Sequence, residues 1–97
     1  MIPAEITEQR SSESGQLLES LVQEWCHAIT TPEHFSIKRN EGQESILLEI
    51  LADSHAARYL IGTKGQTVEA MRLLCRQIGW RHGKRVSVEV VIWGELG

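Results

Sequence analysis

The sequence predicts an α+β domain in which three helices cover one face of a three-stranded mixed sheet. Three observations lead to this prediction. The length of 97 residues suits one hydrophobic core. Apolar residues recur with either a helical or an alternating period, in the order helix, strand, strand, helix, helix, strand. A short turn joins the first two strands, which predicts antiparallel pairing, whereas two helices separate the second strand from the third, which predicts parallel pairing.

The first helix is expected over residues 15–29. Its apolar residues recur at steps of three and four, and they are Leu17, Leu18, Leu21, Val22, Trp25 and Ile29. Ser14 is the expected N-cap, and Pro32 ends the segment because a residue before proline avoids helical geometry. Residues 1–14 are polar and acidic without a period, so we expect a flexible tail there and a second, short tail over residues 94–97.

Strands are expected over residues 34–40 and 44–51, joined by a turn around Gly42. Alternation in the second strand places three apolar side chains on one face, namely Ile46, Leu48 and Ile50. The last strand is expected over residues 85–93 and carries on one face Val86, Val88, Val90 and Ile92. A half-buried sheet with one apolar face follows from this pattern.

Two helices flank the segment Gly62-Thr63-Lys64-Gly65. The shorter helix is expected over residues 55–61 with Asp53 or Ser54 as its cap. The longer helix is expected over residues 66–78, with an apolar stripe made of Val68, Met71, Cys75 and Ile78. Gly79 then stands where a left-handed C-terminal position is expected.

The net charge of −3 hides a segregation of charge along the chain. Residues 55–85 hold seven basic residues and only one acidic residue, Glu69. This segment could form a basic face that meets a polyanion. The alternative is an ordinary solvated surface whose basic side chains pair with the acidic first half of the chain.

The Gly62–Gly65 segment combines features that suit a phosphate group. A helix begins immediately after it, so free backbone N–H groups and the positive end of the helix dipole face the loop. We expect the two glycines to remove Cβ atoms that would block a sugar-phosphate backbone, and Lys64 to add a charge-assisted contact. A plain helix–loop–helix corner would also explain the glycines, but it would not explain the lysine.

The stretch ARYLIGTKGQTVEAMRLL, followed by KRVSVEVV, resembles a KH domain of type II, the arrangement found in bacterial and archaeal KH proteins. It is similar to the KhpA type of small stand-alone bacterial KH protein and to the KH module of Jag-type proteins. The resemblance covers roughly residues 16–93. It implies a type II KH fold and binding of single-stranded RNA, in which the GxxG loop grips the backbone of about four nucleotides.

Carried over by position, the loop consists of Gly62, Thr63, Lys64 and Gly65, and the resemblance implies that Ile61 and Val68 help to line the groove for the bases. From charge alone, further phosphate contacts are expected from Arg58, Arg72, Arg76, Lys84 and Arg85. Relatives often carry basic or amide side chains at both middle positions of the loop. Thr63 departs from that pattern, so we expect a modest affinity.

Chemistry beyond binding is not predicted. The chain shows no nucleophile with a base, no paired carboxylates in an apolar context and no phosphate-binding signature of a nucleotide hydrolase. Cys26 and Cys75 do not combine with the histidines at metal-ligand spacing. We therefore expect no catalytic residues, no metal, no cofactor and no small-molecule substrate. Without a candidate signal peptide or membrane span, the expected location is the cytoplasm, away from membranes.

Three classes of function remain open. The first is an RNA-binding protein that acts as an RNA chaperone or post-transcriptional regulator, as a homodimer or with a Jag-type KH partner, as the resemblance implies. The second is an adaptor that binds protein, motivated by a possible apolar patch on the outer sheet face that consists of Leu47, Leu51, Val91 and Trp93. Binding of single-stranded DNA is a third, since nothing in the sequence identifies a reader of the ribose hydroxyl.

Overall fold

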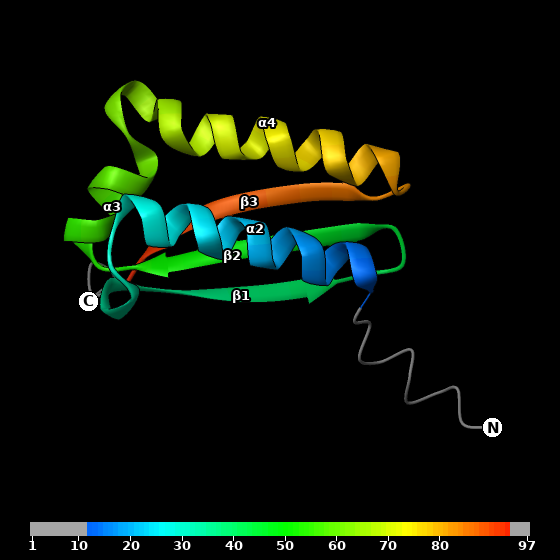
Figure 1. Cartoon of the computed structure of the whole chain (residues 1–97), viewed down its shortest axis with the longest axis horizontal. Coiled ribbons are helices and arrows are strands. Elements are labelled where there is room, and N and C mark those ends of the chain that lie inside the picture. Colours follow the sequence, from blue (N-terminus) through cyan, green and yellow to red (C-terminus); the bar gives the residue numbers. More distant parts are fainter. Residues whose placement is uncertain (1–11, 94–97) are drawn as a thin grey trace.

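The chain forms the predicted order of helices and strands in a computed structural model that describes residues 12–93 (Figure 1). The elements are α2 (Glu13–Ile29), the 3₁₀ turn η1 (Pro32–His34), β1 (Phe35–Glu41), β2 (Ser45–Ala52), α3 (Ser54–Ile61), the 3₁₀ turn η2 (Thr63–Gly65), α4 (Gln66–Arg81) and β3 (Arg85–Ile92). The tails predicted over residues 1–14 and 94–97 lie outside the described residues, apart from positions 12–14.

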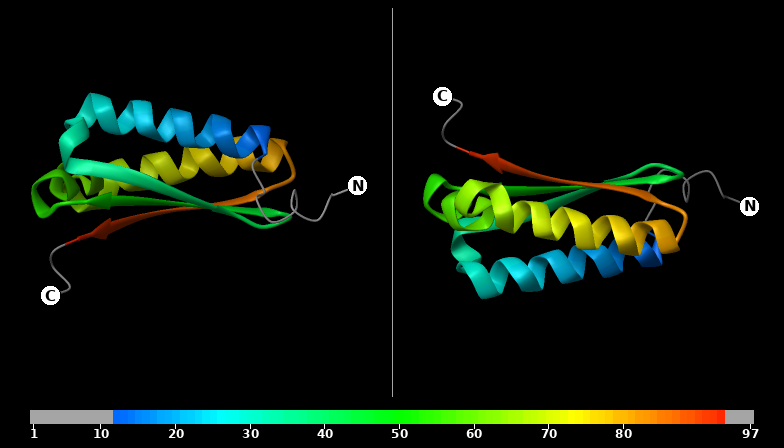
Figure 2. Two further views of the ribbon diagram at one scale, coloured as in Figure 1. Left: turned by 90° about the horizontal axis from the view of Figure 1, so that it is seen from below. Right: turned by 90° about the horizontal axis from the view of Figure 1, so that it is seen from above.

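The sheet has the strand order β1-β2-β3. Strand β1 pairs antiparallel with β2, with Ile37 opposite Ile50, and β3 pairs parallel with β2, with Val90 beside Ile50. The helices all lie on one face of the sheet, as the two edge views in Figure 2 show. This arrangement confirms the predicted α+β class with a three-stranded mixed sheet and three helices on one face.

The core lies between the helices and the inner face of the sheet. Strand β2 supplies its centre through alternation, because every second side chain is almost fully buried: Ile46, Leu48, Ile50 and Ala52. Helix α2 meets them with Leu18, Val22 and Cys26, which succeed one another at steps of four. Leu17, which was predicted to belong to this stripe, is instead 45% exposed, and Trp25 is only half-buried.

Helix α2 begins at Glu13, two residues earlier than predicted, and Ser12 rather than Ser14 is its cap. The Ser12 hydroxyl accepts a hydrogen bond from the Gly15 N–H at 2.9 Å and donates one to the buried Glu41 carboxylate at 2.7 Å. Arg39 lies 3.0 Å from the same carboxylate. The start of α2 is therefore fixed to the end of β1, a contact 29 positions apart in sequence that local patterns do not reveal.

Helix α4 also runs further than predicted, to Arg81. Gly79 is not its left-handed terminal position. That position is Gly83, with a φ of 72°, and the Gly83 and Lys84 N–H groups donate to the carbonyls of Trp80 (3.1 Å) and Gly79 (2.8 Å), as in a Schellman motif. Gly79 is required for space instead, since a Cβ there would lie 2.3 Å from Cγ2 of Val86. It lets α4 approach β3 closely.

Replacing Gly79 by alanine should therefore destabilise the fold. The added Cβ would also lie 2.9 Å from the Lys84 carbonyl oxygen, which is backbone and cannot rotate away. We expect a loss of about 1–3 kcal/mol in the free energy of unfolding, as for other overpacked sites, despite the higher helix propensity of alanine. Urea denaturation measures it, with the exposed Gln77→Ala on the same helix as control. Equal midpoints for both variants would contradict the close approach.

Candidate functional site

Helix α3 orients the loop that follows it, and Asp53 determines where this helix starts. The Asp53 carboxylate accepts a hydrogen bond from the Ala56 N–H at 2.8 Å and lies 2.5 Å from Nδ1 of His34. The backbone hydrogen bond from Ala56, and then the hydrogen bond with His34, lower the pKa of Asp53 below its ordinary value of 3.8. The cap expected at Asp53 or Ser54 is thus Asp53, and it joins the start of α3 to η1.

A single 3₁₀ turn, η2, connects α3 to α4, and three of the four residues of the Gly62–Gly65 loop have positive φ angles. Gly62 ends α3 with a φ of 81°, and Lys64 and Gly65 follow with values of 56° and 74°. The Gly65 N–H donates to the Gly62 carbonyl at 3.1 Å and closes a 3₁₀ turn. A lysine in the left-handed region is uncommon, so the turn holds Lys64 in a specific conformation.

The two glycines of the loop serve different purposes. A Cβ at Gly62 would lie 2.2 Å from Oγ1 of Thr67, so this glycine leaves space for a side chain of the protein itself. Gly62 thus has a role inside the protein besides the clearance for a ligand that the sequence predicts for both glycines. A Cβ at Gly65 would meet no atom within 4 Å. Gly65 alone faces open space, next to an exposed Lys64.

The start of α4 differs from those of the other two α-helices that the structure describes. Side chains cap α2 and α3, namely those of Ser12 and Asp53, whereas the N-cap of α4 is Gly65, which offers no side-chain acceptor. The N–H groups of the first turn and the positive end of the helix dipole thus face the loop without a side-chain oxygen of the protein. An anion at this place would supply the missing acceptor.

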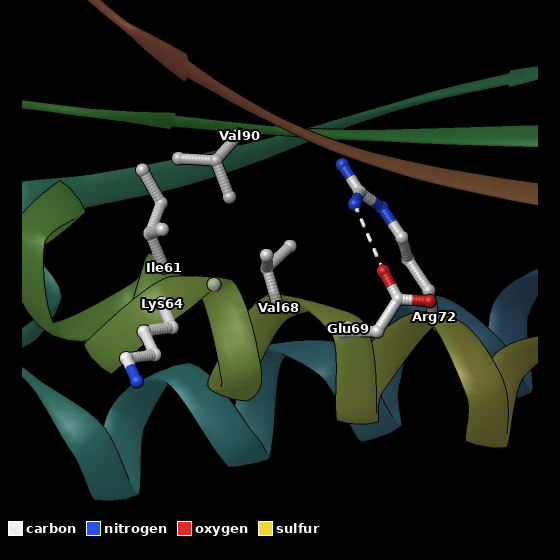
Figure 3. A pocket seen from close by; sticks show the side chains of 7 residues that line it. Ile61, Lys64, Val68, Glu69, Arg72 and Val90 are labelled. Atoms are coloured by element: carbon white, nitrogen blue, oxygen red, sulfur yellow. Dashed lines mark hydrogen bonds and ion pairs between the residues drawn. The ribbon is translucent and has the colours of Figure 1, made fainter.

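A groove of about 440 Å³ adjoins the loop between α3, α4 and β3. Its lining consists of Ile61, Lys64, Gly65, Val68, Glu69, Arg72 and Val90. Figure 3 shows Ile61, Val68 and Val90 converging on an apolar floor, while the Lys64 side chain extends away from the strands in this view. The groove thus combines an apolar base with a charged rim, and we call it the loop groove.

Arg72 is held tightly at one side of the loop groove. Its Nε donates to the Val88 carbonyl at 2.9 Å, and its Nη atoms lie 3.3 Å from Glu69 and 3.5 Å from Glu89. Glu69 also lies 3.6 Å from Arg76. The basic side chains here pair with acids of α4 and β3, not with the acidic first half of the chain. Glu69 and Glu89 therefore reduce the positive charge that the sequence predicts around the loop.

The structure divides the predicted contact residues between separate places. The loop groove unites Ile61, Lys64, Gly65, Val68 and Arg72, with Gly62 and Thr63 adjacent in the chain. Arg58 is exposed on α3, one turn before the loop, and does not line the groove. Arg76, Lys84 and Arg85 line a second groove toward the other end of α4. The basic residues therefore do not form one continuous face around the loop.

Sequence reasoning missed three residues of the loop groove and its border, Val90, Glu69 and Glu89. Alternation predicts that Val90 lies on the inner face of its strand, and the parallel pairing of β3 with β2 brings it to the loop groove. The distribution of charge along the chain does not indicate that Glu69 and Glu89 pair with Arg72. Their positions three residues before Arg72 on a helix, and on the adjoining strand, were the available signal.

The described residues give no support to metal binding or to thiol chemistry. Residues 12–93 contain no group of three side chains suited to hold a metal ion. Burial raises the pKa of the Cys26 thiol to about 12 and that of Cys75 to about 11, so both stay protonated and unreactive near neutral pH. None of the described helices has the length and apolar character needed to cross a membrane.

Comparisons with known proteins place the chain in a family and support its fold. The family model described as KhpA/KhpB, KH domain, matches residues 19–90. A protein of Chlamydia pneumoniae named RNA-binding protein KhpA is 30% identical over 63 residues, which cover 65% of this chain and 81% of the relative. The crystal structure of an Aquifex aeolicus Era variant bound to GDP and aluminium fluoride shares the fold, with a TM-score of 0.58 and 23% identity. That match covers 84% of this chain but only 32% of the Era chain.

The Asp53 cap predicts a specific dependence of stability on pH. Because the folded-state pKa is lowered, the carboxylate stabilises the fold above the ordinary value of 3.8, and this contribution is lost as the pH falls through the lower folded pKa. Asp53→Asn keeps a capping side chain but removes the charge. The natural chain should melt at a higher temperature than the variant at about pH 6, and the difference should shrink below about pH 4. A difference that is independent of pH would contradict this role.

Proposed function

The chain belongs to the KhpA/KhpB KH-domain family, and on this basis we propose that it binds single-stranded RNA by gripping the sugar-phosphate backbone with the Gly62–Gly65 loop. The open space beside Gly65 is the observation that carries the proposal. It lies at the uncapped N-terminus of α4 and next to Lys64. A phosphate there would receive N–H donors, the helix dipole and a lysine charge together.

The loop groove supports the second half of the proposal, which concerns the bases. Ile61, Val68 and Val90 offer an apolar floor beside the place proposed for the backbone. KH modules grip about four nucleotides in this way, with the bases turned away from the loop. Arg72 and Glu69 stand at the rim as a fixed pair of donor and acceptor. We assign this pair to the edges of bases, because its charge is internally compensated and suits a phosphate poorly.

The biological role follows from binding without catalysis. We propose an RNA chaperone or post-transcriptional regulator in the cytoplasm, in which the loop residues and the outlying Arg58 contact phosphates. No step of this function requires a cofactor. Single-stranded DNA would fit the same groove in principle, since no described residue is assigned to the ribose hydroxyl, and the experiment below includes it.

Association with protein is a second candidate, and the outer face of the sheet favours it. No described helix covers this face, and Leu51 and Val91 adjoin there as neighbours in the parallel ladder. Trp93 follows with 42% of its surface exposed, and its N–H donates to the Ala52 carbonyl at 2.9 Å. Leu47, also expected in this patch, pairs with Ser87 further along the strands. The partner would be a second copy of the chain or a Jag-type KH protein.

Removing the charge of Lys64 tests the RNA proposal. Asparagine tolerates the left-handed conformation that Lys64 adopts, so Lys64→Asn should keep the loop intact. For three phosphate contacts, the logarithm of affinity should fall with the logarithm of salt with a slope of about −2, and the variant should bind more weakly with a slope about 0.7 shallower. Fluorescence anisotropy of a labelled single-stranded RNA, at several salt concentrations, measures both quantities.

Lys38→Asn is the matched control, because it removes one charge from an exposed side chain of β1, away from the loop groove. It should leave the affinity and the salt slope near those of the natural chain. An equal loss in both variants, or none in Lys64→Asn, would show that the loop is not the site. Equal affinity for DNA of the same sequence would favour a general reader of single strands.

The association candidate has a separate test. If the outer face joins two copies, the mass of the natural chain measured by light scattering should be that of a dimer, and Trp93→Gln should return it to that of a monomer. A monomeric natural chain would remove the homodimer and leave the Jag-type partner.

A further inference from the structure

A second groove lies along the same helix and strand as the loop groove, near the C-terminal end of α4. It measures about 480 Å³ and is lined by Arg76, Gln77, Trp80, Lys84, Arg85, Val86 and Ser87. Strand β3 contributes to both grooves, through Val90 in the first and through Val86 in the second. Four residues of strand separate these positions, roughly 13 Å. One extended ligand could therefore occupy both grooves.

Trp80 is the most exposed large apolar side chain among the described residues, with 77% of its surface accessible. Its indole makes no ring contact with another described aromatic side chain. The backbone that carries it is nevertheless rigid, because the preceding Gly79 packs against Val86 and the Trp80 carbonyl accepts a hydrogen bond from Gly83. An exposed indole on a backbone held in this way is a suitable platform for stacking a planar ligand.

The charge of this groove differs from that of the loop groove. No acidic side chain lines it, whereas Glu69 lines the loop groove. Arg85 is exposed and makes no ion pair with a described residue. Lys84 is oriented by donating from Nζ to the Gln43 carbonyl at 2.9 Å, a bond that leaves its charge uncompensated. The groove beside Trp80 is thus more electropositive than the loop groove.

We propose that this groove is a second nucleic-acid subsite, in which a base of the strand held by the loop stacks on Trp80 while Arg85 and Lys84 contact phosphates. The inference rests on the proposed function and extends its footprint beyond about four nucleotides. Between the two subsites the RNA would pass over Arg72 and Glu89, whose charges compensate each other. We call the line along which α4 packs on β3 the seam. Binding affinity for RNA therefore comes from the two ends of the seam, with little electrostatic contribution from its middle.

The length of the RNA distinguishes this subsite from the loop. Oligouridines of about four and about twelve nucleotides are titrated by anisotropy against the natural chain, Trp80→Ala and Trp80→Phe. Trp80→Ala should weaken the longer RNA at least about fivefold, the equivalent of one stacked base, and leave the shorter RNA unchanged. Trp80→Phe should restore most of the loss. Arg85→Gln should make the salt slope about 0.7 shallower for the longer RNA only.

Leu17→Ala, which removes a similarly exposed apolar side chain from α2, outside both grooves, is the control and should leave the binding of both RNAs unaffected. If Lys64→Asn weakens binding of the longer RNA and Trp80→Ala does not, the second subsite is overturned and the proposed function stands. Equal weakening of both RNAs by Trp80→Ala would also overturn it, since the effect would then come from the fold or the loop. Absence of binding by the natural chain to either RNA would overturn both proposals, and Trp80 would then be a candidate contact for protein.

Discussion

The close approach of α4 to β3 at Gly79 is the constraint on which the site geometry depends. With a hydrogen atom in place of a side chain, the helix packs directly against Val86, and its direction along the strand is determined there. The N-terminus of α4 is thereby brought opposite Val90, where the loop groove forms. The same contact fixes the backbone at Trp80. Both grooves are consequences of one helix lying along one strand.

The local electrostatic potential of this molecule depends on which charged side chains lie next to one another, and not on the net charge. The chain has a net charge of −3, and its basic segment still contributes unequally along α4. Glu69 and Glu89 compensate Arg72 in the middle of the seam, whereas Lys64 and Arg85 have no described acidic partner at its two ends. Because screening limits the range of charges to about 10 Å at moderate salt, a ligand meets two separate basic regions.

Local patterns predicted the fold well, since alternation and helical periods depend on which side chains face the core. They failed where a distant contact decides the outcome. Ser12 caps α2 because Glu41 lies beside it, and position 79 inside α4 is a glycine because Val86 occupies the adjoining space. For the site, the loop and its apolar neighbours were predictable from spacing. The pairing of Arg72 with Glu89 was not, because the two residues are 17 positions apart and only the packing of α4 on β3 brings them together.

The unequal surroundings of the two loop glycines bear on how variation at these positions would be tolerated. At Gly62 a new side chain collides with Thr67, so a screen for folding and a screen for binding should reject the same substitutions. At Gly65 the protein offers a new side chain ample room, and only the backbone angle resists it. Selection for folding alone would therefore be permissive at the second glycine. A glycine that is kept at position 65 in functioning relatives would therefore indicate that a ligand contacts the backbone there.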